Sequence, residues 1–418
     1  MFSFFYEGAV TMARVYPKVY ITLKGEKHLK SGHPWVFGEE ITEVCGSCEN
    51  GDVVDVYSQK ERWLGAGYIN DNSKIRVRII SRNANDKFDE AFYERRLRYA
   101  VEYRKTVMGA EDFKCCRLIF GEADCFPGLT VDRFGDILVV QVLCLGTERI
   151  KHFLIPKLVE ILRESGESVT AVYERNDVAI REREGLEQYK GFFAADGLRT
   201  DLDGFTEIVE NGIKYRVDYI NGQKTGYFLD QKYNRLAIRR IAEGRKVLDC
   251  FTHTGAFALN AAAAGAALVT AVDVSAEALE SAAFNASLNG FENVEFKCAD
   301  VFDLLTGMKE NGRCDYDFII LDPPAFTKSS ATVKAAYRGY KEINLKAMKL
   351  LPRGGYLATC SCSHFMTDEL FCEMLREAAA DAGVSLRQIE CRQQSADHPI
   401  LWNVPETSYL KFYIFQVV

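Results

Sequence analysis

The feature that most constrains the fold is an alternation of strand-like and helix-like segments after about residue 205. A hairpin-like stretch at 206–220, turning at Asn211-Gly212, comes first. Short apolar runs then recur at 246–250, 268–273, 294–300, 316–322, 355–361, 385–391 and 409–418, and helix-length intervals separate most of them. Strands joined by helices form right-handed crossovers, so the sequence predicts an α/β fold with a mostly parallel, doubly wound sheet. Since no helix follows the last strand, we expect one antiparallel pairing at an edge.

The 418 residues are too many for one ordinary core, and two further regions precede this sheet. Residues 17–81 contain short β-rich pieces separated by Gly, Asn, Asp and Ser, which favours a small barrel or sandwich. An amphipathic helix at 86–107 is followed by strand-like pieces at 117–121, 129–133, 137–143 and 169–174, with a helix at 148–165. We therefore expect three domains: β-rich at 17–83, connecting α+β at 84–200, and α/β at 201–418.

The composition narrows the cellular setting. No apolar run is long enough to cross a bilayer, and residues 1–14 lack the pattern of a signal peptide, so we read them as an extension with Met12 as an alternative start. We expect a cytoplasmic protein that does not bind membranes. Thirteen cysteines without a secretory signal favour free thiols. The pair Cys45 and Cys48 has zinc-ligand spacing but no second pair follows, so we predict no metal site.

A basic cluster lies near the start of the β-rich region, although the net charge is −7. Lys24, Lys27, Lys30 and His33 precede the aromatic Trp35. A solvated surface is the ordinary explanation. The more specific explanation is that this cluster contacts nucleic acid, because cations can hold phosphates while neighbouring aromatic rings stack on bases.

The stretch LDPPAF at 321–326 ends a buried strand on an acid and fixes its exit with two prolines. Proline holds φ near one value and has no N–H donor, so the exit cannot continue as a ladder strand. The result is a rigid rim at the carboxyl end of a strand, where open α/β sheets bind their ligands.

Acids stand at four successive strand ends: Asp249, Asp273, Asp300 and Asp322. The loop after the first strand, 248–259, lacks the GxGxxG of a dinucleotide site, which favours a compact ligand without a phosphate. Asp273 is suited to the hydroxyls of a ribose, and Asp300 to an adenine amino group. A single such acid is often only a helix N-cap, but four in register favour a ligand site.

With these motifs, the C-terminal half resembles the Rossmann-like S-adenosylmethionine methyltransferases. From about residue 17 onward, the chain resembles bacterial large-subunit ribosomal RNA methyltransferases that place a PUA domain before this fold and methylate carbon 5 of a cytosine. The segments that match are 24–41, 222–235, 248–259, 321–326, 361–366 and 394–399. One departure is Ala325, where the RNA cytosine enzymes often carry a cysteine directly after the proline.

The resemblance implies S-adenosylmethionine as cofactor, ribosomal RNA as partner and a PUA-like domain that binds it. The oligomeric state stays open, with a homodimer as one alternative. The implied cofactor-binding residues are Asp249, Phe251, Thr252, Gly255, Asp273, Asp300 and Asp322.

The resemblance also implies a cysteine nucleophile. Carbon 5 of cytosine attacks a methyl group poorly until a thiolate has added to carbon 6. Cys360 and Cys362 end the fifth strand, and the motif match favours Cys362, although alternation puts both on one face and a buried structural cysteine is the ordinary alternative. Asp322 and the carbonyl of Pro323 are expected to read the edge of a base flipped out of its stack.

Other polar and aromatic residues in the matched segments are candidates for substrate contacts. We expect Phe326 and His398 to contact the substrate, and His364 or His398 to act either as base or as a structural histidine. Lys224 and Arg235 would meet the methionine carboxylate or an RNA phosphate. Two other functions stay open: a nitrogen methyltransferase that needs no cysteine, and a non-catalytic RNA-binding or ribosome-assembly factor.

Overall fold

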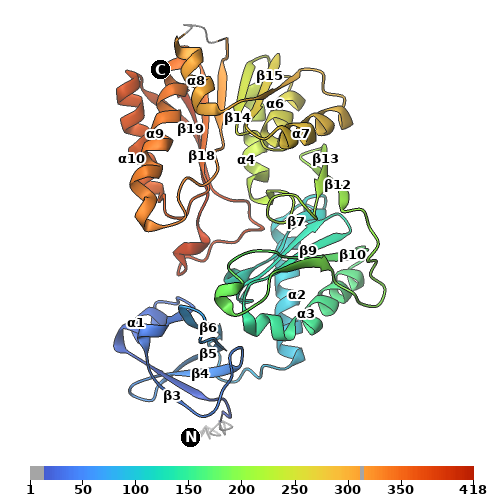
Figure 1. Cartoon of the computed structure of the whole chain (residues 1–418), viewed down its shortest axis with the longest axis vertical. Helices are drawn as coiled ribbons and strands as arrows, with labels where there is room; N and C mark the ends of the chain where they lie inside the picture. Colours follow the sequence, from blue (N-terminus) through green and yellow to red (C-terminus); the bar gives the residue numbers. More distant parts are fainter. Residues whose placement is uncertain (1–13, 311–314) are drawn as a thin grey trace, which may run out of the picture.

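The computed structural model describes residues 14–310 and 315–418, which form three large sheets and a hairpin (Figure 1). Residues 1–13 of the predicted extension, with Met12, lie outside the described residues, whereas its last residue, Arg14, is described. No helix in the described part is long and apolar enough to cross a membrane.

The N-terminal sheet has six strands in the order β2-β6-β5-β4-β1-β3. The strands are β1 (Lys18–Ile21), β2 (Trp35–Phe37), β3 (Ile41–Cys45), β4 (Val53–Ser58), β5 (Trp63–Ile69) and β6 (Ile75–Ser81). The sequence pattern did not predict the helix α1 (Leu23–Lys30), which begins where the side chain of Thr22 accepts a hydrogen bond from the backbone N–H of Gly25 at 3.2 Å. Only Gly25 and Leu29 of α1 are buried, which explains why its apolar periodicity is weak.

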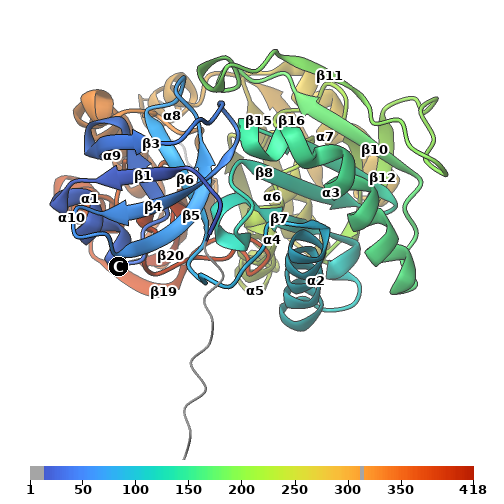
Figure 2. The ribbon, with the colours of Figure 1, turned by 90° about the horizontal axis from the view of Figure 1, so that it is seen from below.

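The connecting region has a five-stranded sheet in the order β11-β10-β9-β8-β7, with the apolar core between it and the helices α2 (Glu90–Val107) and α3 (Leu145–Glu164). Figure 2 shows this region beside the N-terminal sheet, in agreement with an ion pair of 3.0 Å between Arg78 of β6 and Glu122. The predicted helix at 86–107 begins later, after its cap Asp89. The strands are β7 (Cys115–Phe120), β8 (Leu129–Phe134), β9 (Ile137–Val142), β10 (Ala171–Asn176) and β11 (Tyr189–Phe192).

A hairpin joins the connecting region to the C-terminal sheet. Its strands are β12 (Phe205–Glu210) and β13 (Ile213–Asp218), and the φ angles of 54° at Asn211 and 76° at Gly212 fit the predicted two-residue turn. Tyr215 of β13 packs in one core with Val139 of β9 and Leu259 of the C-terminal region. The hairpin is therefore part of the core that links the two regions.

The C-terminal sheet has seven strands in the order β16-β15-β14-β17-β18-β20-β19. The first five are parallel, as predicted, but β20 pairs antiparallel with both β18 and β19. The expected single antiparallel pairing at an edge was therefore wrong, because the last strand inserts inside the sheet. The strands are β14 (Lys246–Cys250), β15 (Leu268–Asp273), β16 (Val294–Cys298), β17 (Phe318–Leu321), β18 (Tyr356–Ser361), β19 (Leu386–Arg392) and β20 (Lys411–Val417).

Helices cover both faces of this sheet (Figure 1). One face packs against α8 (Val301–Glu310), α9 (Val333–Leu350) and α10 (Asp368–Ala382). The other packs against α4 (Lys232–Ala237), α5 (Arg239–Ala242) and α6 (Ala256–Ala263), and α7 (Ala276–Leu288) lies beside β16 and β13. The sheet is doubly wound, and its strand order changes direction between β14 and β17, the place where such folds bind ligands.

Candidate active site

A cavity of about 310 Å³ opens beside the carboxyl ends of β14, β15, β17 and β18. This volume is in the range of small-molecule sites. Its walls come from the loops that follow these four strands, from the segment at 223–235 and from Leu410. Among the predicted residues, the cavity brings together Phe251, Thr252, Asp273, Asp322, Pro323 and Cys362, with Lys224 and Arg235 beside them.

The loop after β14 adopts a conformation that L-residues rarely take. Phe251, His253 and Gly255 have φ angles of 64°, 51° and 84°. Left-handed backbone at non-glycine residues is a small store of strain that recurs at functional sites. Gly255 provides the turn and a close helix packing, since a Cβ there would lie 3.0 Å from Ala282 of α7. It does not line the cavity, and its contact with the cofactor stays a prediction.

Asp249 holds this loop in place through hydrogen bonds. It is fully buried, and its Oδ2 accepts hydrogen bonds from Thr252 Oγ1 at 2.6 Å and the backbone N–H of Ala258 at 2.9 Å, while Oδ1 has no partner. Burial raises the pKa of Asp249 to about 7, and the Thr252 hydrogen bond opposes this. The carboxylate faces the first turn of α6 and does not line the cavity, so the direct contact of Asp249 with the cofactor stays a prediction.

Asp273 and Asp300 differ in whether their carboxylates face the cavity, where they could bind a ligand. Asp273 lines the cavity and accepts one backbone hydrogen bond on each oxygen, from His253 at 2.9 Å and Ser275 at 3.0 Å, which leaves lone pairs for a ligand. Asp300 is exposed, lies outside the lining and accepts from the backbone N–H of Phe302 at 2.7 Å as the cap of α8. Its predicted contact with adenine stays a prediction.

Asp322 and Pro323 form the rim predicted from LDPPAF. Asp322 Oδ1 accepts a hydrogen bond of 3.1 Å from Gln231 Nε2, and the side-chain oxygen Oε1 of Gln231 accepts one of 2.6 Å from Asn234 Nδ2. This second bond turns the NH₂ group of Gln231 toward the acid. Burial raises the pKa of Asp322 to about 6, despite the opposing charge of Arg235. Part of the Asp322 population therefore keeps its proton near neutral pH.

The structure separates the two cysteines that spacing did not. Cys360, within β18, is fully buried in the core of the sheet, whereas Cys362 follows the strand and lines the cavity. Burial, together with the charge of Asp322, raises the pKa of Cys362 to about 11, and Lys224 and Lys411 oppose this effect. The thiol is therefore protonated near neutral pH, in an environment that a change at Asp322 can alter.

Arg235 borders the cavity, but its charge is already matched. Its Nη1 donates to both oxygens of the buried Glu210, at 2.7 and 3.0 Å, and to the hydroxyl of Tyr227 at 2.9 Å. This ion pair fastens the hairpin to α4. Lys224, which is exposed at the rim with a φ of 53°, is the freer of the two predicted cations.

Two predicted substrate residues of the catalytic region pack elsewhere. Phe326 lies against Tyr340 of α9, with ring centroids 4.6 Å apart, and does not line the cavity. His398 is buried, with its Nδ1 3.0 Å from Asp397 Oδ1 and its ring 5.4 Å from Phe120 of the connecting region. The contacts of Phe326 and His398 with the substrate, and the role of His398 as a base, stay predictions, although both side chains pack against the protein here. His364 lies outside the lining, and its Nδ1 is buried without a partner.

The residues of the N-terminal basic cluster also differ in whether they are exposed or buried. Lys24, Lys27 and Lys30 are exposed along α1. His33 is buried, with its ring stacked on His28 and its Nε2 3.1 Å from Glu406 Oε2 of the C-terminal region. The lysines stay candidates for phosphate contact, and the substrate contact of His33 also stays a prediction, although its side chain here links the N-terminal and C-terminal regions.

Among the cavity-wall residues that sequence reasoning missed are Gln223, Tyr227, Phe228, Asp230 and Gln231. They belong to the matched segment 222–235, in which only the cations had been singled out. Polar residues crowded into a short stretch just before an apolar strand were the available signal.

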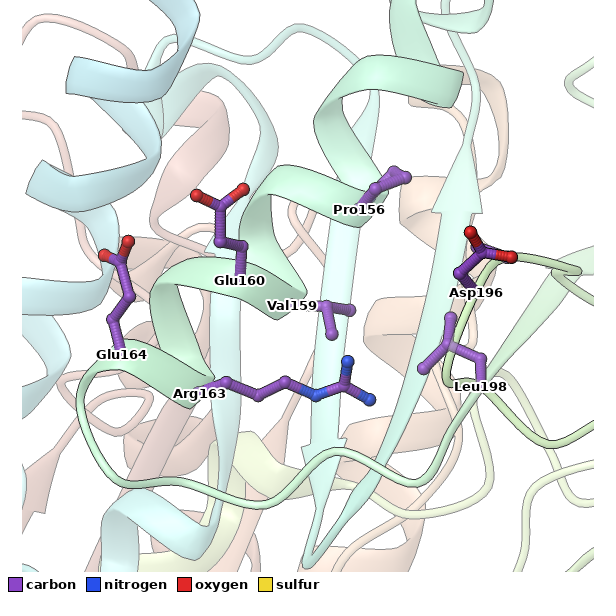
Figure 3. A pocket seen from close by; sticks show the side chains of 8 residues that line it. Pro156, Val159, Glu160, Arg163, Glu164, Asp196 and Leu198 are labelled. Atoms are coloured by element: carbon purple, nitrogen blue, oxygen red, sulfur yellow. The ribbon is translucent and has the colours of Figure 1, made fainter.

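A second hollow of about 240 Å³ lies on α3, between Val159, Arg163 and Leu198 (Figure 3). Arg163 is engaged there with the backbone carbonyls of Val169 and Gly197 at 2.9 and 2.7 Å. The hollow is in the connecting region, away from the ends of the catalytic strands, and contains none of the predicted site residues.

The main cavity suits the cofactor that the motifs imply. Asp273 offers free lone pairs for ribose hydroxyls, Val274 and Ala278 give an apolar wall, and Lys224 offers a cation for a carboxylate. The described residues contain no cluster of three or more His, Cys, Asp or Glu side chains arranged to hold a metal.

Comparison with known proteins agrees with this geometry. Residues 116–415 match the model of the S-adenosylmethionine-dependent methyltransferases, and residues 19–82 match a PUA-like domain. Ribosomal RNA large subunit methyltransferase I of Klebsiella pneumoniae (strain 342) is 38% identical over 406 residues, which cover 97% of this chain and 99% of that protein. The enzyme of the same name from Escherichia coli O157:H7 is 39% identical over 395 residues, covering 94% and 97%.

Solved structures share the fold. A SAM-dependent methyltransferase structure from Streptococcus mutans superimposes with a TM-score of 0.79 at 22% identity, covering 96% of this chain and 100% of that one. The methyltransferase SMU.776, crystallised with SAH, gives 0.80 with the same identity and coverage. The chain belongs to the S-adenosylmethionine-dependent methyltransferases, in the group that carries a PUA-like domain before the catalytic fold and includes ribosomal RNA large subunit methyltransferase I.

Proposed function

We propose that this enzyme methylates carbon 5 of a cytosine in large-subunit ribosomal RNA through a covalent adduct with Cys362. The names of its relatives support the RNA. The observation that carries the mechanism is that Cys362 borders the same cavity as Asp322 and Pro323, whereas Cys360 is sealed in the core. A ribosomal RNA substrate is consistent with a cytoplasmic protein.

In this mechanism the Cys362 thiolate adds to carbon 6 of the cytosine, and a sulfur–carbon bond forms. The electron pair of the ring double bond moves toward N3, where the protonated carboxyl of Asp322 donates its proton. The carbonyl of Pro323 accepts a hydrogen bond from the exocyclic amine. S-adenosylmethionine supplies the electrophilic methyl group that carbon 5 takes. A base then removes the carbon-5 proton, the double bond between carbons 5 and 6 forms again as Cys362 leaves as a thiolate, and N3 returns its proton to Asp322.

Substrate binding activates the thiol in this scheme. In the free enzyme the negative charge of Asp322 opposes a second negative charge on Cys362, and burial adds to the cost. When N3 of the bound cytosine accepts a hydrogen bond from Asp322, the protonated and neutral form of this acid is favoured, so that opposition is weakened before the proton is transferred, while Lys224 and Lys411 continue to favour the thiolate. The nucleophile therefore forms when the correct base is in place, which protects the free enzyme from unwanted thiol chemistry.

The test uses large-subunit RNA from cells that lack the gene. Wild-type enzyme and cofactor should produce 5-methylcytidine, detected by mass spectrometry of nucleosides. Cys362→Ala should abolish turnover with cofactor affinity unchanged, because the thiol reacts and does not hold the cofactor. Cys360→Ala is the matched control and should stay active. RNA with 5-fluorocytosine at the target should trap the wild type, since fluorine replaces the proton that must leave.

The outcomes separate the alternatives. A methylated nitrogen, with full activity in the double cysteine variant and no trapped adduct, would replace this mechanism by nitrogen methylation. A trap at Cys360 would show that the wrong cysteine was chosen. Absence of any methylated nucleoside would favour the binding or assembly factor.

A further inference from the structure

Trp402 stands out from the other described tryptophans. It is 98% exposed, whereas Trp35 and Trp63 are partly buried and donate their Nε1–H to carboxylates at 3.0 and 2.9 Å. A tryptophan with its whole ring in water forgoes the burial that usually stabilises this side chain. Such a residue has to be explained by flexibility or by a partner.

Flexibility is not the explanation that the local contacts favour. Trp402 lies at the tip of a tight turn, in which the backbone N–H of Val404 donates to the carbonyl of Leu401 at 2.9 Å. Thr407 closes the loop by accepting a hydrogen bond of 2.9 Å from the backbone N–H of Leu401, and Val404 is buried. The turn is held firmly while its indole points away from the protein.

The turn lies against the end of α1. Asn403 donates a hydrogen bond to the carbonyl of Gly32, and a Cβ on Gly32 would come within 2.7 Å of the Asn403 side chain. Lys27 and Lys30, both exposed, lie on the last turns of the same helix. The turn that carries Trp402 therefore contacts the PUA-like domain just after the helix that bears these two lysines, although Trp402 belongs to the C-terminal region.

The other end of the same loop reaches the cavity. The hydroxyl of Tyr409 donates to Asp230 Oδ2 at 2.6 Å, and Leu410 lines the cavity wall. Figure 1 shows this C-terminal loop, in red, extending from the catalytic sheet toward the other two regions. A strand of RNA held by α1 and directed to the cavity would pass along the loop that carries Trp402.

We propose that Trp402 stacks on an unpaired base of the bound RNA, between the lysines of α1 and the catalytic cavity. This inference rests on the proposed function, in which RNA is the substrate. Proteins hold single-stranded RNA by stacking bases on exposed rings while nearby cations hold the phosphates. A protein partner would require an apolar patch, but the exposed neighbours of the indole include Asn403 and Glu406.

The experiment uses the full chain and an unstructured oligoribonucleotide of about 12 nucleotides, the scale of one single-strand binding site. Trp402→Ala should weaken its binding roughly tenfold, and Trp402→Phe should keep most of the affinity because a ring remains. The salt dependence should be unchanged in Trp402→Ala and reduced in Lys27→Gln/Lys30→Gln, since only the lysines release counterions. Ile180→Ala, which removes an exposed apolar side chain outside α1 and outside the loop of Trp402, is the control and should bind normally.

Fluorescence gives an independent reading. RNA should quench wild-type tryptophan emission, and Trp402→Phe should lose this quenching although Trp35 and Trp63 remain. Equal affinity in Trp402→Ala and the wild type, or a wild type that does not bind the oligonucleotide, would overturn the inference. Loss of self-association in Trp402→Ala, with RNA affinity unchanged, would make Trp402 a protein contact instead. RNA binding that depends on Trp402 without any methylated nucleoside would reject the proposed reaction alone.

Discussion

Replacing Asp322 by Asn should make Cys362 a more reactive thiol in a slower enzyme. The two side chains share one cavity wall, and burial together with the charge of Asp322 raises the pKa of Cys362 from 9.0 to about 11. At pH 8 only about one thiol in a thousand is then ionised. Asn keeps the size of the side chain and removes the charge, so the thiolate becomes more common while the proton for N3 is lost.

The expected size of the effect follows from the ranking of its causes. Burial is the largest contribution and persists in the variant, whereas a neighbouring charge shifts a pKa by about one to three units when close and buried. Asp322 is partly exposed, so we take the low end. Alkylation of Cys362 by iodoacetamide at pH 8 should therefore rise roughly five- to tenfold. Methyl transfer should fall in the same variant.

Mass spectrometry of tryptic peptides resolves Cys362 from the other cysteines, and the buried Cys360 serves as an internal control that should stay unlabelled. Lys224→Met should change the rate in the opposite direction, because it removes a cation that favours the thiolate. Alkylation that is equally fast in the wild type and both variants would refute the electrostatic coupling. A variant Asp322→Asn with full methyl transfer would refute its role as the proton donor.

Three other predictions concern the frame of the site. Glu210→Gln should lower the free energy of unfolding by about 3–5 kcal/mol in urea titrations, since it leaves the buried guanidinium of Arg235 without its carboxylate. Asp273→Ala should weaken cofactor binding about tenfold in calorimetry, and an unchanged affinity would remove it from the site. Burial opposes ionisation of Asp397, but His398 and its other partners outweigh burial and hold the pKa of Asp397 well below 3.8. The ionised Asp397 therefore stabilises the fold above about pH 4, and this contribution to the free energy of unfolding is lost as the pH falls further. In Asp397→Asn the melting temperature should depend less on pH between about pH 5 and pH 3 than it does in the wild type.

Elements with a clear period were predictable from the sequence. The runs at 246–250 and 268–273 match β14 and β15 residue for residue. The helix α1 and the strand β11 were missed because each is short and buries too few side chains to show a period. The composition of the last two strands indicates the position of β20. Most residues of β20 are apolar and buried on both faces, as in an interior strand, whereas β19 carries several exposed polar residues, as edge strands do.

Positions that depend on contacts between distant regions could not be predicted. His33 and His398 stand in matched loops, and nothing local distinguishes a ligand contact from a structural one. His33 pairs with Glu406 across the whole chain, and His398 packs on Phe120 of another region. Their burial is a property of how the regions assemble, which the local sequence does not encode.

The four acids at strand ends divide according to the backbone donors that follow them. The helix α6 begins at Gly255, which has no side chain to cap it, and the carboxylate of Asp249 accepts the N–H of Ala258 in its place. Asp300 itself caps α8. Both acids are used by the free N–H groups of the next helix, so neither lines the cavity.

The other two acids remain available because those donors are supplied or removed by different residues. The helix α7 has its own cap, since Ser275 Oγ accepts from the N–H of Ala278 at 3.1 Å, and Asp273 is left at the cavity wall. After Asp322 come Pro323 and Pro324, which have no N–H to donate, so no following turn can capture its carboxylate. The double proline thus has a second consequence beyond stiffness: it keeps an acid free at the edge of the sheet. An acid at a strand end is a strong ligand candidate when an independent cap or a proline follows it, and a weak one when the next helix lacks a cap.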